Sequence, residues 1–381
     1  MKHLFTNTIS CLIICTSVFA QQATIDTIPF SLEKRLLVFK GNINGIPVDF
    51  AFDTGAAYTV SNSSTNNTNK IELSGGKKTV KDANQQVAKI DNTTINKLTI
   101  GSFTIRNLKA LSYDMPYLNC ANIVLLGQDV IKHLNWKIDF EKQVLYVSNT
   151  VFSADTTMIG WPIFYRGGRP HVNYMVNGKK YSNCLIDMGF TQIFDANSNV
   201  EALSTEAKVK INLQKANQQI SSSMGLMGLG TPDAITYFIA DSIYFNNTLF
   251  TKVPVSLNSK TDTKLGVQFF NSTCKQLLFN FSNNTMYLEL KNEVISPLNQ
   301  FDARVSMQDG KLMITGKNMS SNTTATKLDM GEIVKAVNGK QYSDFSSECE
   351  YLLWTYQYKA PTITVEKMNG EIVTIKRSTL L

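Results

Sequence analysis

The chain contains two copies of one sequence pattern. Of all its sequence features, this internal repeat restricts the possible folds most. The segment 42–55, NINGIPVDFAFDTG, has a counterpart at 174–189, YMVNGKKYSNCLIDMG. Each copy reads as a strand, an Asn-Gly turn and a second apolar strand that ends on Asp-x-Gly, which is typical of a β-hairpin. The turns lie 133 residues apart, and Asp53 and Asp187 lie 134 apart. This agreement predicts two copies of one β unit in tandem.

Two later landmarks occur in the same order in both copies. Ala-Asn-Gln-Gln stands at 83–86 and again at 216–219, and a Leu-Gly turn stands at Gly127 and again at Gly266, each followed by a closing hairpin. The offset grows from 133 to 139 residues between these landmarks, which fits a glycine-rich insertion, SSSMGLMGLGTP, in the second copy. We therefore expect two β units of about 130 residues each, the usual size of one domain, within residues 30–291.

The composition agrees with a folded, mainly β protein. Hydrophobic residues make up 43% of the 381 positions and charged residues 18%, which is too apolar for a disordered chain. Many Val, Ile, Thr and aromatic residues with frequent Asn-Gly punctuation favour strands over helices. The sequence predicts a signal peptide at 1–20, a first lobe at 21–150, a second lobe at 151–292 and a small α+β domain at 298–381.

The N-terminus predicts export from the cytoplasm. Lys2 and His3 precede an apolar stretch from Leu4 to Phe19, and Ala20 precedes two glutamines, which is the pattern of a cleavable secretory signal peptide. No later segment has the roughly 18 uninterrupted apolar residues that a spanning helix requires. We therefore expect a secreted or periplasmic protein with no transmembrane segment.

Cysteine spacing and charge argue against several classes of function. The four cysteines beyond the signal peptide lie far apart without a CxxC or Cys/His cluster, so neither a metal site nor a dithiol redox motif is indicated, and no cofactor is expected. Buried free thiols and one or two disulfides both stay open. The formal charge of +7 is spread without a run of five like charges, so we expect no nucleic-acid partner. These cysteines are Cys120, Cys184, Cys274 and Cys349.

The repeated aspartates stand where a carboxyl group could perform chemistry. Each follows a buried strand, and the glycine two positions later permits a tight turn with the backbone close to the site. Two carboxyl groups a few ångströms apart cannot both ionise, so such a pair holds a single proton over a wide pH range. One group can then take a proton from water while the other donates to a carbonyl oxygen. An ordinary Asp-x-Gly turn is the alternative at each position.

The stretch from Phe52 to Ala56, with the apolar-apolar-Gly element that ends at Gly127, resembles the retropepsin-like and pepsin-like aspartic proteases. The resemblance implies two acid-protease β-barrel lobes related by a pseudo-two-fold axis, a polypeptide substrate and no metal. It implies Asp53 and Asp187 as the catalytic pair. Residues that would support the two active-site loops are Thr54, Gly55, Gly127, Gly189 and Gly266. A flap tip over the substrate would comprise Ala83, Asn84, Gln85 and Gln86, whereas the second copy at 216–219 is expected to be a polar surface loop.

The second copy departs from the family pattern at Met188. In the family, a hydroxyl residue after each aspartate bonds across to the loop of the other lobe, and methionine has no hydroxyl. A buried polar group without its partner costs about 1–3 kcal/mol, so either Thr54 has another partner or the second loop is looser. The resemblance implies an endopeptidase. Two alternatives stay open: an inactive peptide-binding pseudoprotease, and a homodimer that uses only Asp53 of each chain.

The repeat ends after Pro297, and the remaining residues resemble the second half of a PDZ domain. The sequence reads as a strand, an Asn-Gly turn at 338–339, a helix over about 343–354 and a closing hairpin with its turn at 369–370. The resemblance implies a module that binds an extended peptide as an added strand, and so recruits substrate or regulates access. A cap that only packs on the two lobes is the alternative.

Overall fold

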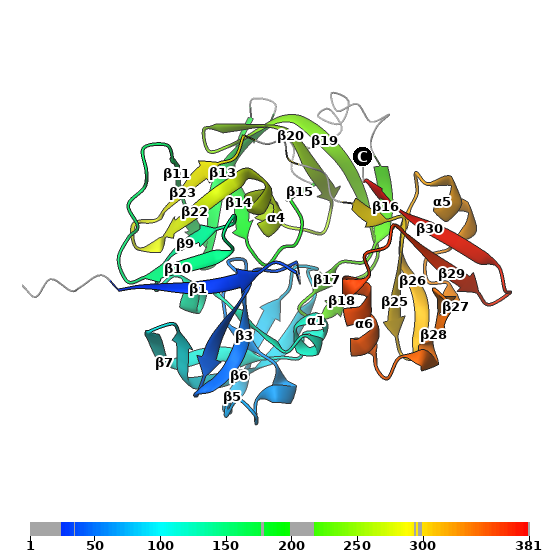
Figure 1. Ribbon diagram of the computed structural model, residues 1–381, viewed down its shortest axis with the longest axis horizontal. Helices are drawn as coiled ribbons and strands as arrows, with labels where there is room; N and C mark the ends of the chain where they lie inside the picture. The colour runs from blue at the N-terminus through cyan, green and yellow to red at the C-terminus, as the bar shows by residue number, and fades with distance from the viewer. Residues whose placement is uncertain are drawn as a thin grey trace, which may run out of the picture.

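The computed structural model shows a mainly β chain with two β lobes and a separate C-terminal domain (Figure 1). The predicted signal peptide, the second Asn-Gly turn and Pro297 lie outside the described residues. The structure describes residues 24–379 apart from 34, 177–178, 199–216, 293–294 and 296–298.

The first lobe holds one aspartate at the end of a buried strand. Strands β3 and β8 pair in parallel, and residues 50–52 and 123–126 are buried because apolar clusters cover both faces of the sheet. Asn44 and Gly45 have φ of 51° and 84°, as a type I′ hairpin turn requires. The elements are β1 (Ile25–Ser31), β2 (Val38–Ile43), β3 (Ile46–Phe52), β4 (Val60–Ser61), β5 (Glu72–Lys81), β6 (Val87–Ile100), β7 (Phe103–Ser112), α1 (Pro116–Cys120), β8 (Ile123–Leu126), α2 (Gln128–Ile131), β9 (Asn135–Asp139) and β10 (Val144–Ser148).

The second lobe repeats this arrangement. Its strand β14 ends on Asp187 and lies parallel to β21, as β3 lies parallel to β8. The elements are β11 (Ile159–Pro162), β12 (Phe164–Arg166), β13 (Arg169–Val176), β14 (Lys179–Asp187), β15 (Phe194–Asn197), β16 (Asn217–Ser221), β17 (Met224–Gly225), β18 (Gly228–Leu229), β19 (Asp233–Phe245), β20 (Thr248–Asn258), β21 (Lys264–Gly266), α4 (Val267–Thr273), β22 (Cys274–Asn280) and β23 (Thr285–Leu290).

One repeat landmark is not structurally equivalent in the two lobes. Residues 83–86 form a hairpin tip between β5 and β6, whereas the described part of the second copy, 217–219, begins strand β16. Gln219 is buried there and pairs with Asn318 of the C-terminal domain. The expectation of a polar surface loop is therefore wrong for these residues, because β19 and β26 pair with them as a strand, although the side chain of Gln218 stays exposed.

The two lobes share a sheet that explains their symmetric placement. The closing hairpins β9–β10 and β22–β23 lie side by side, and β22 runs antiparallel to β9. β1 flanks the first hairpin and β11 flanks the second, so six strands are arranged symmetrically about the β9–β22 contact. The ring centroids of Phe52 and Trp136 lie 4.9 Å apart, and Phe279 of the second lobe packs 6.4 Å from Phe52. The predicted mainly β fold with two tandem lobes is confirmed.

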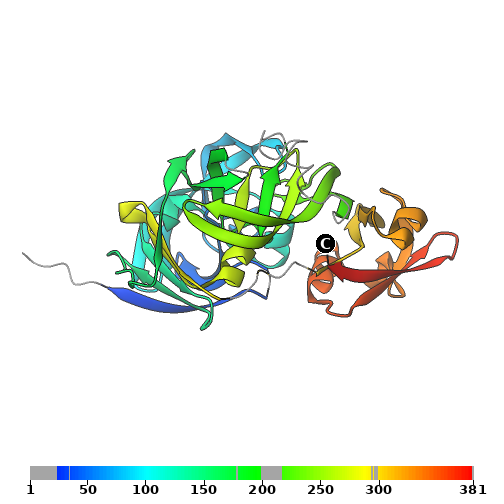
Figure 2. The same ribbon diagram turned by 90° about the horizontal axis from the view of Figure 1, so that it is seen from above.

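The C-terminal domain lies to one side of the lobes and has its own apolar core (Figure 2). The predicted order of strand, turn, helix and hairpin is present, although residues 342–344 form a 3₁₀ turn and the helix begins at Glu348. Ser347 caps this helix by accepting a hydrogen bond from the Glu350 amide. The elements are β24 (Asn299–Phe301), β25 (Ala303–Gln308), β26 (Lys311–Asn318), α5 (Asn322–Lys327), β27 (Ile333–Val337), β28 (Lys340–Gln341), α6 (Glu348–Gln357), β29 (Thr362–Lys367) and β30 (Ile372–Thr379).

This domain is attached to both lobes. A disulfide joins Cys120 of α1 to Cys349 of α6, and the rings of Tyr117 and Tyr356 lie 4.5 Å apart between the same helices. On the other side, β26 pairs with β16 of the second lobe. The two remaining described cysteines are buried free thiols, Cys184 and Cys274. Among the described residues, no helix combines the length and apolar character needed to cross a membrane.

Candidate active site

The structure brings Asp53 and Asp187 together where the two lobes meet. Asp53 follows β3, Asp187 ends β14, and their side chains share a hydrogen bond. A Cβ atom added to Gly55 would overlap the carboxyl group of Asp187, and one added to Gly189 would overlap that of Asp53. Each loop therefore needs glycine so that its backbone can lie against the aspartate of the other lobe. This reciprocal contact gives the site an approximate two-fold symmetry.

The two carboxyl groups are held by their own loops. One oxygen of Asp53 accepts hydrogen bonds from the amides of Gly55 at 2.8 Å and Ala56 at 3.0 Å, and Asp187 accepts one from Gly189 at 3.1 Å. Burial, and next the negative charge of Asp187, raise the pKa of Asp53 to about 8, against the opposing effect of the amides. Asp53 is therefore a carboxylic acid at neutral pH beside a second carboxyl group.

Thr54 braces the two loops without a hydroxyl partner at position 188. Its buried Oγ1 donates to the carbonyl oxygen of Ile186 at 2.6 Å and accepts from the amide of Met188 at 3.0 Å. Both partners belong to the backbone, so the identity of the side chain at 188 does not affect them. The side chain of Met188 is itself fully buried in the main apolar core. Thr54 thus has its cross-lobe partners, and only the converse bonds from a hydroxyl at 188 are lost.

The glycines of the two Leu-Gly turns pack closely against the loops that follow Asp53 and Asp187. The amide of Gly127 donates to Thr59 Oγ1 at 3.2 Å, and a Cβ atom there would overlap the backbone of Tyr58. A Cβ atom added to Gly266 would likewise overlap the carbonyl oxygens of Phe190 and Gln192, in the loop after β14. Sequence reasoning missed Asp129, which accepts from the Thr59 amide at 2.9 Å and hydroxyl at 2.7 Å. The Gln-Asp pair directly after the Leu-Gly turn was the available signal.

The predicted flap residues form the tip of the β5–β6 hairpin, and three of the four line the cleft. Asp82, which sequence reasoning did not single out, shapes this tip by accepting from the amides of Asn84 at 2.8 Å and Gln86 at 3.0 Å. Gln85 has a φ of 64°, the left-handed conformation that closes the turn. Ala83, Asn84 and Gln85 all line the cleft beside the aspartates.

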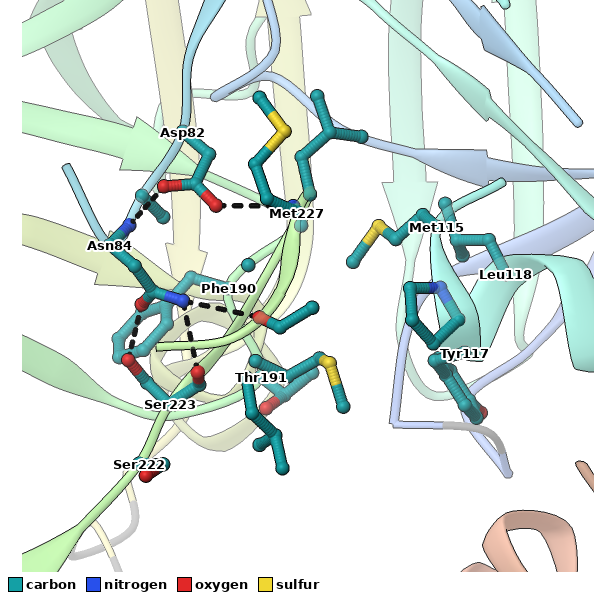
Figure 3. A pocket seen from close by; sticks show the side chains of 18 of the residues that line it. Asp82, Asn84, Met115, Tyr117, Leu118, Phe190, Thr191, Ser222, Ser223 and Met227 are labelled. Atoms are coloured by element: carbon teal, nitrogen blue, oxygen red, sulfur yellow. Dashed lines mark hydrogen bonds between the residues drawn. The ribbon is translucent and has the colours of Figure 1, made fainter. Parts of the chain in front are cut away.

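The predicted flap tip is hydrogen-bonded to a small hairpin of the second lobe, β17–β18 (Figure 3). Asn84 Nδ2 donates to the Ser223 carbonyl oxygen at 2.9 Å, and the Ser223 hydroxyl donates back to Asn84 Oδ1. The amide of Met227 donates to Asp82 Oδ2 at 3.2 Å. Met227 also packs against an apolar wall of the first lobe that includes Tyr117. We call these contacts the cross-lobe bonds of the flap; the glycine-rich insertion, with Gly225, Gly228 and Gly230, supplies the second-lobe side.

The second lobe contributes buried charges that the sequence did not reveal. Lys264 Nζ lies 3.9 Å from Asp187 Oδ2, and both side chains are largely buried. Asp195 is buried nearby and accepts hydrogen bonds from the hydroxyls of Ser256 and Thr261. Burial raises the pKa of Asp195, and the positive charge of Lys264 opposes that rise. Within the described residues, no group of three His, Cys, Asp or Glu side chains is arranged to hold a metal ion.

A single cleft connects the aspartate pair with the C-terminal domain. It has a volume of about 1390 Å³ and extends from Asp53 and Asp187, past the flap, to β25 and α6. Pockets for small ligands have about 300–1,000 Å³, so this cleft has room for a polymer. Asp53 is only partly buried and remains open to the cleft.

Comparisons with known proteins agree with the first lobe's motif. Residues 39–130, which hold Asp53 and Gly127, match the model of a family described as aspartyl protease. Similar solved structures include a retropepsin-like aspartic protease from Rickettsia conorii, with 20% identity, covering 33% of this chain and 91% of that one, at a TM-score of 0.26. An aspartic proteinase from Irpex lacteus is 11% identical, and the match covers 71% of this chain and 98% of that one at a TM-score of 0.42. A structure titled edgp is 9% identical, and the match covers 70% of this chain and 94% of that one at a TM-score of 0.41. No curated protein matches the chain.

Proposed function

We propose that the protein is an aspartic endopeptidase that hydrolyses peptide bonds with a water molecule activated by Asp53 and Asp187. The observation that carries this proposal is the reciprocal contact of the two carboxyl groups, each backed by the glycine of the other lobe's loop. The aspartyl protease match over residues 39–130 supports peptidase activity independently.

The raised pKa of Asp53 suggests how the two carboxyl groups divide the work. Asp187, as the carboxylate, takes a proton from water while the water oxygen adds to the peptide carbonyl carbon. Asp53 gives its proton to the carbonyl oxygen, so that a neutral tetrahedral diol forms. When the C–N bond breaks, a diol proton returns to Asp53 as the carbonyl re-forms, and Asp187 gives its proton to the leaving nitrogen. The pair again holds one proton, and no covalent intermediate or metal takes part.

The substrate that suits this cleft is an extended polypeptide. Among the described strands, β25 pairs only with β26, and its other edge faces α6 within the cleft. An extended chain can add to such an edge through main-chain hydrogen bonds. We propose that the C-terminal domain acts in this PDZ-like manner to recruit or hold substrate beside the aspartate pair. Part of that edge is already used, since Tyr351 donates to the Val305 carbonyl oxygen at 3.0 Å.

Cleavage of an unfolded protein by three forms of the enzyme tests the proposal. Wild type, Asp53→Asn and Asp187→Asn are each incubated with the substrate from acid to neutral pH, and thermal unfolding verifies that the variants fold. Loss of cleavage in both variants is the expected result. Cleavage that survives Asp187→Asn would support the homodimer instead, although both aspartates meet here within one chain. Peptide binding without cleavage by wild type would support the pseudoprotease.

We also propose that the protein works outside the cytoplasm, either secreted or in a periplasm. The predicted signal peptide at 1–20 supports this location, and so does the disulfide between Cys120 and Cys349, since disulfides persist in oxidising compartments. N-terminal sequencing of the exported protein is expected to show a start near Gln21. A mature chain that retains Lys2 in the cytoplasmic fraction would contradict the proposal.

A further inference from the structure

Lys264 breaks the symmetry of the two lobes beside the aspartate pair. In the first lobe, Leu125 of β8 pairs with Ala51 of β3, and at the equivalent place in the second lobe Lys264 of β21 pairs with Leu185 of β14. The first lobe therefore has an apolar side chain where the second has a cation. A buried ammonium group is unfavourable unless charged or polar groups surround it, so the partners of Lys264 indicate its role.

The surroundings of Lys264 are suited to hold a positive charge. Its Nζ lies 3.9 Å from Asp187 Oδ2, with side-chain exposures of 7% for the lysine and 13% for the aspartate. The ammonium group also lies 4.4 Å from the ring centroid of Phe190, within the range of a cation–π contact. Asp195, on the neighbouring strand β15, is close enough for the charge of Lys264 to act on it. Lys264 thus lies between a catalytic carboxyl group and a supporting one.

No comparable cation acts on Asp53 in the part of the chain that the structure describes. Burial and then the charge of Asp187 raise the pKa of Asp53, and only the amides of its own loop oppose the rise. Two other acidic groups act within this cluster, Asp53 after β3 and Asp195 on β15. Around them, Tyr237 on β19 and Arg304 on β25 interact with the Asp195 side of the cluster. Strand β13, which pairs with β14, carries His171 and Arg169, and Arg169 forms a 3.7 Å ion pair with Asp262.

We infer that Lys264 is a positioning residue that keeps Asp187 as the carboxylate of the pair and so leaves the shared proton on Asp53. The inference rests on the proposed peptidase function. It assigns the carboxylate role to Asp187 and the acid role to Asp53, which the symmetry of the two loops alone does not distinguish. The positive charge favours the singly protonated pair over the doubly protonated one. Activity should therefore extend to more acidic pH than it would without the lysine.

The pH profile of kcat/KM tests this role. Lys264→Met keeps most of the apolar stem and removes the charge, so the acid limb of the profile should move to higher pH by about 1–3 units. Lys264→Arg keeps the charge and should restore the wild-type limb. Lys252→Met is the matched control, because it removes an exposed lysine of the same lobe that pairs with Asp241. A Lys264→Met profile that superimposes on the wild-type profile would overturn the inference.

A second measurement separates this inference from the proposed function. If Lys264 and Asp187 form an ion pair, removal of the lysine leaves the buried carboxylate without its cation, a cost that acid removes because carboxylates are neutral there. The loss of Tm in Lys264→Met should therefore be larger at neutral pH than in acid. The variant Lys264→Met/Asp195→Asn, which removes the other carboxylate, should show the same trend. An equal loss at every pH would overturn the ion pair, whereas absence of cleavage by wild type would overturn the peptidase function and with it the catalytic role of Lys264.

Discussion

Position 188 distinguishes the two loops that carry Asp53 and Asp187 at the scale of single residues. By symmetry with Thr54, a hydroxyl at 188 would bond to the backbone of the first loop, and Met188 fills the same place with apolar contacts. Met188→Thr and Met188→Val have nearly the same shape, so their difference isolates the hydroxyl. We expect the free energy of unfolding to be about 1–2 kcal/mol higher for the Thr variant than for the Val variant. Urea unfolding measures this, and equal stabilities would show that no partner is available on the first loop.

Asp53 is expected to reduce stability at neutral pH. Its pKa is raised on folding, so the folded state binds more protons than the unfolded state between about pH 4 and 8, and stability falls as pH rises through this window. Asp53→Asn removes the titration and should raise the free energy of unfolding by about 1–3 kcal/mol at neutral pH. The gain should vanish in acid, where Asp53 is protonated in both states. Unfolding curves at both pH values measure it; a gain of the same size in acid would point to another cause.

The sequence could identify the aspartates but not the charges around them. Asp53 and Asp187 were recognisable because each ends an apolar strand and is followed by a glycine, a local pattern. Lys264 and Asp195 carry no such signal, since a charged residue in a strand usually faces solvent. Their burial follows from the parallel and antiparallel pairing of β21 with two other strands, which joins residues far apart in the chain.

The cross-lobe bonds of the flap are the feature to test at the scale of elements. Asn84→Ala removes both bonds to Ser223, each worth about 0.5–1.5 kcal/mol. Amide hydrogen exchange in residues 82–86 and 223–229 should become about two- to tenfold faster, because the hairpins separate more often. Gln85→Asn is the matched control, since Gln85 is an exposed tip residue and asparagine tolerates its positive φ. Unchanged exchange in Asn84→Ala would mean that backbone contacts alone hold the flap.

Hairpins were easier to predict than their partners. The Asn-Gly turn at 44–45 and the closing hairpins follow from local turn chemistry and alternating side chains. The second Ala-Asn-Gln-Gln, at 216–219, is identical in sequence to the predicted flap tip. Its described residues nevertheless form strand β16, because β19 and β26 pair with it on either side. Sequence similarity between repeats therefore predicted the strand order but not the position of each turn.

At the scale of the whole molecule, the C-terminal domain connects the two lobes across the cleft. It pairs with the second lobe through β16–β26 and packs on the first through α1 and α6. A substrate chain that enters the cleft would thus meet surfaces from all three parts. This arrangement was not predictable from sequence, because the two cysteines that join the first lobe to the domain are separated by 229 residues.

The disulfide between Cys120 and Cys349 should stabilise this three-part arrangement. The variant Cys120→Ser/Cys349→Ser is expected to lose about 2–4 kcal/mol of unfolding free energy, since a cross-link over a long loop restricts the unfolded chain. A reductant should lower the Tm of wild type towards that of the variant and leave the variant unchanged. Cys184 and Cys274 are free and buried in both proteins, so any effect of the reductant on them cancels in the comparison. A reductant effect of equal size in both proteins would mean that the disulfide contributes nothing, and that the packing of Tyr117 on Tyr356 with the β16–β26 pairing holds the domain in place.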